Sequence, residues 1–411
     1  MSAALDIEGP GLPRQTPGPR GGLAQPVARA RAVAPVIAAA APLIEAGRSL
    51  TPDVLDALHG AALFRTLLPR ACNGEEVTPA DFVRMQEVIA AADASTGWCV
   101  GQGSGCSMTA AYMEPEIAWE IWGRDPRAVV AWGMGDGTAV VVPGGYRVTG
   151  KWRFASGAKH ATWIGAHCKV QELDGSIRPG TAGTSQNGVL ERTMMVRRDA
   201  VAFEDVWNVV GLRGTGSDSY TLRDHFVPDA YSVTRDTDEE RRAPGSLYQF
   251  STTHLYSSAF AGVAMGIARS MLEDFKAMAM KKTPAATTRA MRDSEVIQNG
   301  VAQAEAKLRS ARAFLLETLD EAWEGVEARG TLAVEAKVLI RLATTSAIHR
   351  AKEVVEWTYH EAGATAIFLS EPYERRMRDI HASGQQVQGR TQHLELCGQH
   401  FLGRTPQARF L

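Results

Sequence analysis

The segment KWRFASGAKHATW (151–163) holds residue types that could contact a ligand. It begins as a buried strand, with Trp152 and Phe154 alternating against polar neighbours, and is interrupted at Ser156 and Gly157. A glycine inside a strand pattern marks a bulge or a close approach to the backbone. The segment therefore indicates either a ligand that approaches this backbone or an ordinary bulge in a core strand.

Other common chemistries leave no trace in the sequence. There is no HExxH, no GxSxG, no phosphate-binding loop that ends in Gly-Lys-Ser/Thr, and no group of His and carboxylates at metal spacing. The run GMGDGT from Gly133 fails the GxGxxG pattern, because Thr138 occupies the last glycine position. We therefore predict no metal site and no nicotinamide site, so the isolated chain is not expected to oxidise NAD(P)H.

Composition sets the broad class. The chain has 411 residues, of which 45% are hydrophobic and 22% charged, with a net charge of -2. This balance is typical of a soluble protein with two or three domains and predicts no nucleic-acid partner. Five cysteines without a CxxC pair favour free thiols in the cytoplasm. We expect no membrane span, because the apolar run from Val33 to Ile44 is short and contains two prolines. The Gly- and Pro-rich residues 1–25 are expected to be a disordered leader.

The elements that must position these residues change type twice along the chain. Residues 26–126 show helical periodicity and predict three amphipathic helices and a shorter one, with Thr51 and Thr78 as N-caps. Residues 127–235 hold about seven short β-branched runs, which favour an antiparallel β-barrel or sandwich. Residues 245–411 predict four long amphipathic helices in a bundle.

This order of elements, with five motifs at its joints, resembles the acyl-CoA dehydrogenase fold. Within that fold it resembles the flavin-dependent monooxygenases of two-component systems, a group that includes the oxygenase of p-hydroxyphenylacetate hydroxylase and dibenzothiophene monooxygenase. The motifs are LFRTLLPRACNGEEVTPADF, AAADASTGWCV, WRFASGAKHATW, DVWNVVGLRGTGSDSY and AGATAIF followed by PYERRMRDIHASGQQ. The resemblance implies an α+β protein with an N-terminal α-helical domain, a middle antiparallel β-barrel and a C-terminal four-helix bundle.

The resemblance also implies a flavin site. It places Ser156 within hydrogen-bonding distance of flavin N5, and it assigns Gly157 the task of letting the backbone approach the ring. The other implied flavin-binding residues are Trp98, Trp132, Gly133, Phe154, Arg213 and Thr215. For each of them an ordinary structural role, such as a core tryptophan or a polar turn, is the alternative.

Two activities share this fold, and the sequence favours one of them. Acyl-CoA dehydrogenases need a carboxylate base, but the segment IHASGQQVQGR after Arg378 and Asp379 holds none, and neither does HLYSSAFAG from His254. Oxygenation through a C4a-hydroperoxyflavin needs no base of that kind. A dehydrogenase and a catalytically silent scaffold of the same fold remain the alternatives.

The monooxygenases often carry a histidine in the motif RDxxxxxxH, where this sequence has Gln386. Glutamine cannot act as a base near neutral pH, but it can orient a substrate by hydrogen bonds. His160, His381 and His393 are the nearest alternatives, although a structural role is more common for any single histidine. The catalytic candidates are thus Ser156, Gln386, His160 and His381.

The resemblance finally implies partners. The expected protein is a homotetrameric oxygenase component that uses reduced flavin, either FMN or FAD, with O2 as co-substrate. A separate NAD(P)H-dependent flavin reductase supplies the reduced flavin by diffusion. The substrate is a small organic molecule, aromatic or bearing a heteroatom, and the sequence does not identify it.

Overall fold

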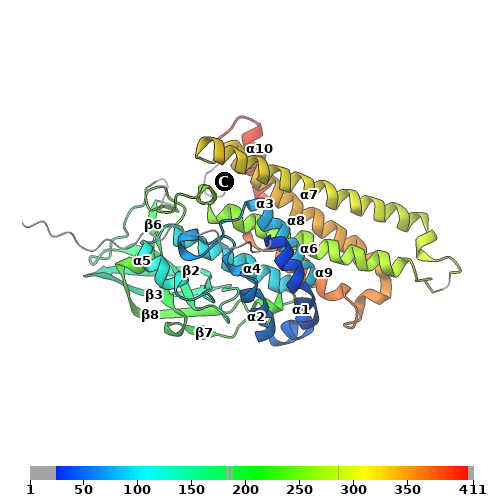
Figure 1. The fold of residues 1–411 in the computed structure, drawn as a ribbon, viewed down its shortest axis with the longest axis horizontal. Helices are drawn as coiled ribbons and strands as arrows, with labels where there is room; N and C mark the ends of the chain where they lie inside the picture. The colour runs from blue at the N-terminus through cyan, green and yellow to red at the C-terminus, as the bar shows by residue number, and fades with distance from the viewer. Residues whose placement is uncertain (1–24, 182–184, 187, 286, 406–411) are drawn as a thin grey trace, which may run out of the picture.

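The computed structural model describes residues 25–181, 185–186, 188–285 and 287–405. The leader predicted for residues 1–25 lies outside this range except for Gln25. Figure 1 shows a β-sheet at one end of the molecule, long helices that extend to the other end, and the N-terminal helices packed between them.

Within the described residues, five α-helices precede the sheet. They are α1 (Pro26–Gly47), α2 (Pro52–Gly60), α3 (Pro79–Ala92), α4 (Ala94–Ser107) and the short α5 (Pro115–Ala118). The helix predicted to begin after Thr78 is followed directly by a second one, because Asp93 adopts an extended backbone and separates α3 from α4. Its side chain caps α4 by accepting from the N–H of Thr96 at 2.7 Å. The predicted cap at Thr78 is confirmed, whereas the side chain of Thr51 makes no capping hydrogen bond.

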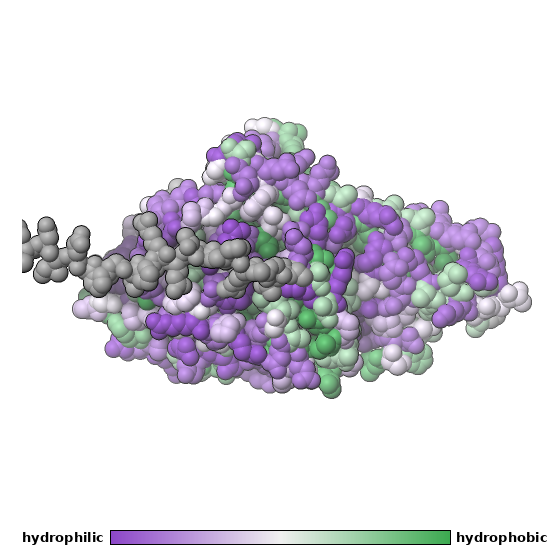
Figure 2. Space-filling view, in the orientation of Figure 1, coloured by the Kyte–Doolittle hydropathy of each residue, from purple (hydrophilic) through white to green (hydrophobic). Residues whose placement is uncertain are grey.

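Helix α1 is long and apolar enough to cross a membrane by length and composition alone. This differs from the expectation, which counted only its central apolar run. In the structure α1 buries Ile37 and Ile44 in the main core. Its outer face leaves Val36 and Leu43 exposed, and Figure 2 shows hydrophobic residues gathered where α1 lies in Figure 1.

The described strands form one sheet. They are β1 (Val130–Trp132), β2 (Met134–Val142), β3 (Gly145–Arg153), β4 (Trp163–Gln171), β5 (Ser185–Gln186), β6 (Val189–Arg197), β7 (Ala202–Glu204), β8 (Ser219–Pro228) and β9 (Ser232–Val233). The order is β5-β6-β4-β2-β3-β8-β7, with β1 on β4 and β9 on β6.

The predicted antiparallel β-barrel is wrong. The sheet is mixed, because β1 and β2 both pair with β4 in parallel. It is also open, because its strand order runs from β5 to β7 and no pairing among the described residues joins these two ends. The cause of the parallel pairing lies between β3 and β4, where the chain leaves the sheet at Phe154 and returns at Trp163 in the direction of β2. A parallel pair needs such a crossover, whereas a tight hairpin would have given an antiparallel one.

The C-terminal part has three long helices, α6 (Thr252–Ala279), α7 (Glu295–Arg329) and α8 (Val334–Ala362). Two shorter helices follow, α9 (Tyr373–Gly384) and α10 (Gln392–Phe401). The prediction of four long helices is therefore correct for the first three and wrong for the fourth. In its place are two short helices, α9, which was not expected, and α10. Figure 1 shows α6, α7 and α8 running side by side away from the sheet.

The buried side chains form two clusters. One is confined to the sheet and includes Trp152 and Tyr220, which stack at 5.2 Å between ring centroids. The other joins the N-terminal helices to the long C-terminal helices and takes in Trp132 of β1. The joint between these clusters holds Trp98, Ser156 and Thr215, three of the residues that the sequence singled out.

Candidate functional site

The crossover from β3 to β4 is fastened to a second loop. The N–H of Ala155 donates to the carbonyl of Asp218 at 3.1 Å, and the N–H of Gly157 donates to the carbonyl of Thr215 at 3.0 Å. Gly157 has a φ of 79°, a left-handed conformation that favours glycine. A Cβ there would lie 3.1 Å from the ring of His160, which is a tight contact.

Three hydroxyls form a hydrogen-bonded chain where these loops meet. The Oγ of Ser156 lies 2.7 Å from the Oγ of Ser217, which lies 2.7 Å from the Oγ1 of Thr215. Thr215 donates to the carbonyl of Leu212 at 2.8 Å, and the indole N–H of Trp98 donates to Ser156 at 3.1 Å. All three hydroxyl residues are buried. The structure thus brings together Trp98, Ser156 and Thr215 from the predicted set.

An aromatic row extends from this chain into the main core. Trp98 stacks on Phe260 with ring centroids 3.8 Å apart, and Phe260 lies 5.8 Å from Tyr256. Tyr256 in turn meets Trp132 edge-on at 6.4 Å, which places Trp132 at the far end of the row. Sequence reasoning missed Tyr256 and Phe260. Their i, i+4 spacing at the start of a helix, which puts both rings on one face, was the available signal.

The backbone of Gly133 faces the sheet. Its N–H donates to the hydroxyl of Tyr220 at 3.2 Å, and that hydroxyl donates to the carbonyl of Gly165. A Cβ on Gly133 would collide with the carbonyl oxygen of Arg153. The close approach that requires glycine here is therefore made by β3.

Exposed apolar side chains gather where β3 ends. Phe154 has a φ of 64°, which turns its side chain out of the strand pattern and leaves it 60% exposed. Met134, paired with Arg153 across the sheet, and Val206 are also exposed. The ring of Trp207 meets that of Phe154 edge-on at 6.1 Å. We call Met134, Phe154, Val206 and Trp207 the apolar face.

Helix α9 contacts the loop that carries Thr215 and Ser217. The carboxylate of Asp379 accepts from the N–H of Leu212 at 2.6 Å, and burial raises the pKa of this carboxyl to about 7. Arg378 pairs with Glu45 at 2.8 Å, and Arg213 lies 3.7 Å from the same carboxylate. Arg213 therefore belongs to an ion-pair group that fixes this loop.

Of the histidine candidates, His160 lies beside Gly157 in the crossover, whereas His381 and His393 lie on α9 and α10. His160 packs its ring 5.6 Å from that of Phe64, and burial lowers its pKa to about 3, so it is neutral near pH 7. His381 lies on α9 with its Nε2 3.3 Å from Glu356. The Nε2 of His393 lies 2.7 Å from the carbonyl of Val387, and burial lowers its pKa.

Gln386 begins the short helix η11 (Val387–Gly389). Its Oε1 accepts from the N–H of Gln388 at 2.8 Å, and its buried Nε2 has no partner among the described residues. Within that part of the chain, no hydrogen bond or ring contact joins Gln386 or His381 to Ser156. Gln386 is thus held with a donor unsatisfied, and it is separate from the hydroxyl chain.

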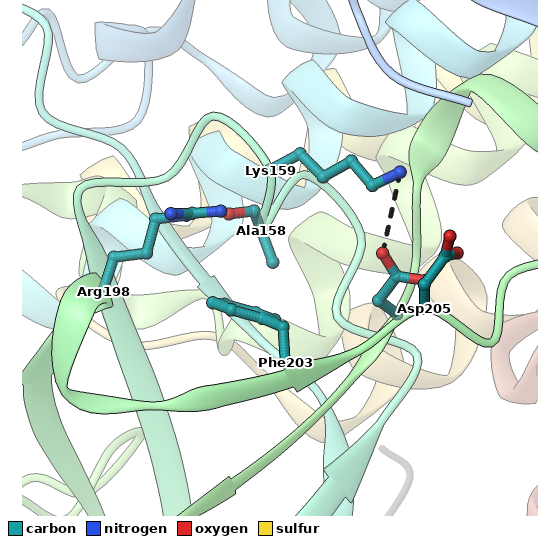
Figure 3. Close-up of a pocket in the computed structure, with 6 residues that line it drawn as sticks. Ala158, Lys159, Arg198, Phe203 and Asp205 are labelled. Atoms are coloured by element: carbon teal, nitrogen blue, oxygen red, sulfur yellow. Dashed lines mark hydrogen bonds and ion pairs between the residues drawn. The ribbon is translucent and has the colours of Figure 1, made fainter. Parts of the chain in front are cut away.

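A surface pocket of about 410 Å³ adjoins the same two loops (Figure 3). Its lining includes Lys159 and Arg198. Lys159 pairs with Asp218 at 3.7 Å, and Arg198 donates to the carbonyl of Ala158 at 2.7 Å while lying over the ring of Phe203. Both cations already have partners within the protein, so the pocket's charges serve to brace the loops.

Comparison with known proteins places this arrangement in context. Residues 258–388 match the family model described as acyl-CoA dehydrogenase, C-terminal domain. An indole-3-acetate monooxygenase of Pseudomonas putida is 30% identical over 365 residues, which cover 89% of this chain and 90% of that protein. The oxygenase component of an FADH(2)-dependent resorcinol hydroxylase from Rhizobium sp. (strain MTP-10005) is 26% identical, with 93% and 95% of the two chains covered.

Solved structures share the whole fold. A 3-HSA hydroxylase from Rhodococcus sp. RHA1 has a TM-score of 0.84 at 24% identity and covers 93% of this chain and 97% of its own. XiaF from Streptomyces sp., solved in complex with FADH2 and glycerol, has a TM-score of 0.85 at 22% identity, with 93% and 96% covered. At these identities the likeness establishes the fold.

Proposed function

Because the chain belongs to the flavin-dependent monooxygenases of the acyl-CoA dehydrogenase fold, as an oxygenase component, we propose that it holds reduced flavin against the apolar face with flavin N5 at Ser156. The observation that carries this proposal is a buried hydroxyl chain beside an exposed aromatic side chain. Apolar surface and one directed hydrogen bond are what a flat ring with a polar edge requires.

The residues present fit a flavin. Phe154 and Met134 offer an exposed apolar surface, and Ser156 lies two residues after Phe154 with its hydroxyl held by Trp98 and Ser217. The indole of Trp98 is itself fixed by stacking on Phe260. A neutral, rigid hydrogen-bonding group beside an apolar face can hold the N5 proton without attracting water.

Reduced flavin supplies the activation of O2 in such enzymes, and the protein supplies binding, orientation and the exclusion of water. In this proposal the hydroxyl of Ser156 keeps the proton at N5, and the aromatic row from Trp98 to Trp132 lines the dry side of the site. Gln386, whose Nε2 has no partner among the described residues, orients the substrate. No residue is assigned as a base, since the pKa of His160 is too low for that task.

We propose FAD as the flavin and a small aromatic compound as the substrate. The first rests on the relative named as FADH(2)-dependent, and the second on relatives named for indole-3-acetate, resorcinol and p-hydroxyphenylacetate. Binding of reduced FAD and reduced FMN, measured anaerobically, tests the first. A separate NAD(P)H-dependent reductase delivers the flavin, as the term oxygenase component in the relatives' names implies.

Assembly and location complete the proposal. Exposed apolar side chains on the C-terminal helices and their connections, Val296, Val334, Ile367, Phe368 and Leu369, provide contact surface for a homotetramer. Light scattering tests this, and a mass near 44.3 kDa would contradict it. All five cysteines are buried free thiols, which suits the reducing cytoplasm.

A single-turnover reaction tests the activity. The protein is loaded with FADH2 under anaerobic conditions and mixed with isotopically labelled O2 and one of the three aromatic compounds. We expect a product that carries one labelled oxygen atom, detected by mass spectrometry. Ser107→Ala serves as the control, because it removes a buried hydroxyl on α4 that is not part of the hydroxyl chain. Oxidation of flavin without labelled product from any of the three would count against the proposed substrate class.

A further inference from the structure

The direction of every hydrogen bond in the hydroxyl chain is fixed by its last member. The carbonyl oxygen of Leu212 can only accept, so the single proton of Thr215 points to it across 2.8 Å. Thr215 must then accept from Ser217, so the hydroxyl proton of Ser217 lies in this hydrogen bond. Ser217 must in turn accept from Ser156, which spends the proton of Ser156.

The opposite direction is disfavoured by the same distance. If Thr215 donated to Ser217, two oxygen acceptors, that of Thr215 and that of Leu212, would face each other at 2.8 Å without a proton between them. The carbonyl of Leu212 is held in place by two further donors, the N–H of Thr215 at 3.2 Å and the indole N–H of Trp207 at 3.1 Å. The chain therefore runs one way, from Ser156 to Leu212.

This leaves Ser156 with a single unused position. Its proton goes to Ser217, and one of its two lone pairs receives the indole N–H of Trp98. What remains is one acceptor lone pair. We propose that Thr215 and Ser217 are positioning residues that make Ser156 an acceptor only, so that the site selects reduced flavin over oxidised flavin.

The chemistry of N5 gives the reason. In reduced flavin N5 carries a hydrogen and can donate to the free lone pair of Ser156, whereas in oxidised flavin N5 presents a lone pair of its own. Two lone pairs that face each other repel, and neither finds a partner. An oxygenase component that takes flavin from a separate reductase thereby binds the reduced form and releases the oxidised form. This inference rests on the proposed function, because it assumes that N5 lies at Ser156.

The quantity to measure is the ratio of the dissociation constants for oxidised and reduced FAD. The first is obtained from flavin fluorescence, the second from anaerobic titration, and the midpoint potential of the bound flavin gives the ratio independently. We expect wild type to bind reduced FAD more tightly. Reduced 5-deaza-FAD, which carries carbon in place of N5 and cannot donate there, should lose this advantage.

Two substitutions should allow Ser156 to donate to the flavin as well as to accept from it. In Ser217→Ala the hydroxyl of Ser156 has no acceptor and can turn to donate to oxidised N5. In Thr215→Val no hydroxyl lies between Ser217 and the carbonyl of Leu212. Ser217 is then free to donate to Ser156. Both should lower the ratio roughly three- to tenfold, the value of one neutral hydrogen bond. Thr215→Ser keeps the hydroxyl and should restore the ratio, whereas Ser107→Ala should leave it unchanged.

The outcomes separate this inference from the proposed function. If wild type binds neither form of the flavin, both fail. If it prefers reduced FAD but Ser217→Ala and Thr215→Val keep the same ratio, the flavin is bound as proposed and the positioning role is wrong. The same holds if reduced 5-deaza-FAD keeps the full advantage. This last measurement uses wild type alone, so it can overturn the inference even if both variants fail to fold.

Discussion

Two of the polar networks buried among the described residues differ in kind. The hydroxyl chain from Ser156 to Leu212 contains only neutral groups and ends on a backbone carbonyl. At the end of the long helices, Arg341 is fully buried and donates to the side chain of Gln388, and burial lowers its pKa to about 10. Burial, followed by the charge of Arg341, lowers the pKa of the nearby His254 to about 3.

The difference teaches how each network can be used. A neutral chain costs little to desolvate, and its donors and acceptors can be aligned in one direction, which suits a site that must recognise where a proton lies. A buried charge costs far more, but it resists displacement once its partners are in place. Arg341 therefore fixes η11, the segment that Gln386 begins, whereas the hydroxyl chain is the network that we propose recognises the proton at flavin N5.

The largest expected effect comes from breaking the charged network. Arg341→Ala leaves a cavity and removes the donor to Gln388, and we expect a loss of about 3–5 kcal/mol in the free energy of unfolding. Arg341→Met fills most of the space and should lose less. Chemical denaturation measures both. The FAD preference of the folded fraction should not change, and a change would mean that the two networks are coupled.

Asp379 links the loop to the helices and gives the next largest effect. Burial raises the pKa of this carboxyl to about 7, opposed by the hydrogen bond from the N–H of Leu212. The charges of Asp93 and Glu45 also raise the pKa, and that of Arg375 lowers it. The folded state thus holds a proton that the unfolded state has lost between about pH 4 and pH 7. The free energy of unfolding should therefore fall as pH rises through this window.

Asp379→Asn keeps an oxygen that can accept from Leu212 and removes the titration. Relative to wild type, its free energy of unfolding should increase by roughly 2–4 kcal/mol between pH 4 and pH 8. Denaturation at a series of pH values measures this difference. A difference that stays constant with pH would show that Asp379 does not titrate in this range.

Ser156→Ala acts on the neutral network and should have a smaller effect on stability but a clear one on chemistry. If N5 lies at Ser156 as proposed, the variant loses one hydrogen bond to N5, worth about 0.5–1.5 kcal/mol, and leaves the N5 proton freer to depart. We expect up to about tenfold more hydrogen peroxide per flavin oxidised, since about 1.4 kcal/mol corresponds to a factor of ten. Equal peroxide yields in the variant and wild type would remove Ser156 from the site.

The parts of the fold that could be predicted are those that depend on residues close together in the sequence. The helices follow from periodicity and caps, as at Thr78. The resemblance pointed to the loops of Ser156 and Thr215. The parallel pairing of β2 with β4 could not be read from the strands, because it depends on where the chain turns at Phe154, and no local pattern gives the sign of φ for a phenylalanine.

The hydroxyl chain itself was beyond sequence reasoning. Ser156 and Ser217 are 61 residues apart, and a separation of 2.7 Å between their oxygens is a property of the packed loops. The same applies to Phe260, whose stacking on Trp98 joins α6 to α4. Sequence patterns identify residues able to form such contacts, but tertiary packing decides which of them meet.

Trp98→Phe gives the smallest effect and separates orientation from direction. Phenylalanine keeps a ring on Phe260 but removes the indole N–H that donates to Ser156. The proton of Ser156 still goes to Ser217, because that direction is set by Leu212 and not by Trp98. Ser156 therefore stays an acceptor, and the ratio of the two FAD dissociation constants should stay within about twofold of wild type, whereas both constants should rise by up to about threefold as the hydroxyl loses one restraint. Anaerobic and aerobic titrations of this variant beside Ser217→Ala measure both quantities. A ratio that falls in Trp98→Phe as far as in Ser217→Ala would mean that the indole, and not the carbonyl at the end of the chain, determines which way Ser156 points.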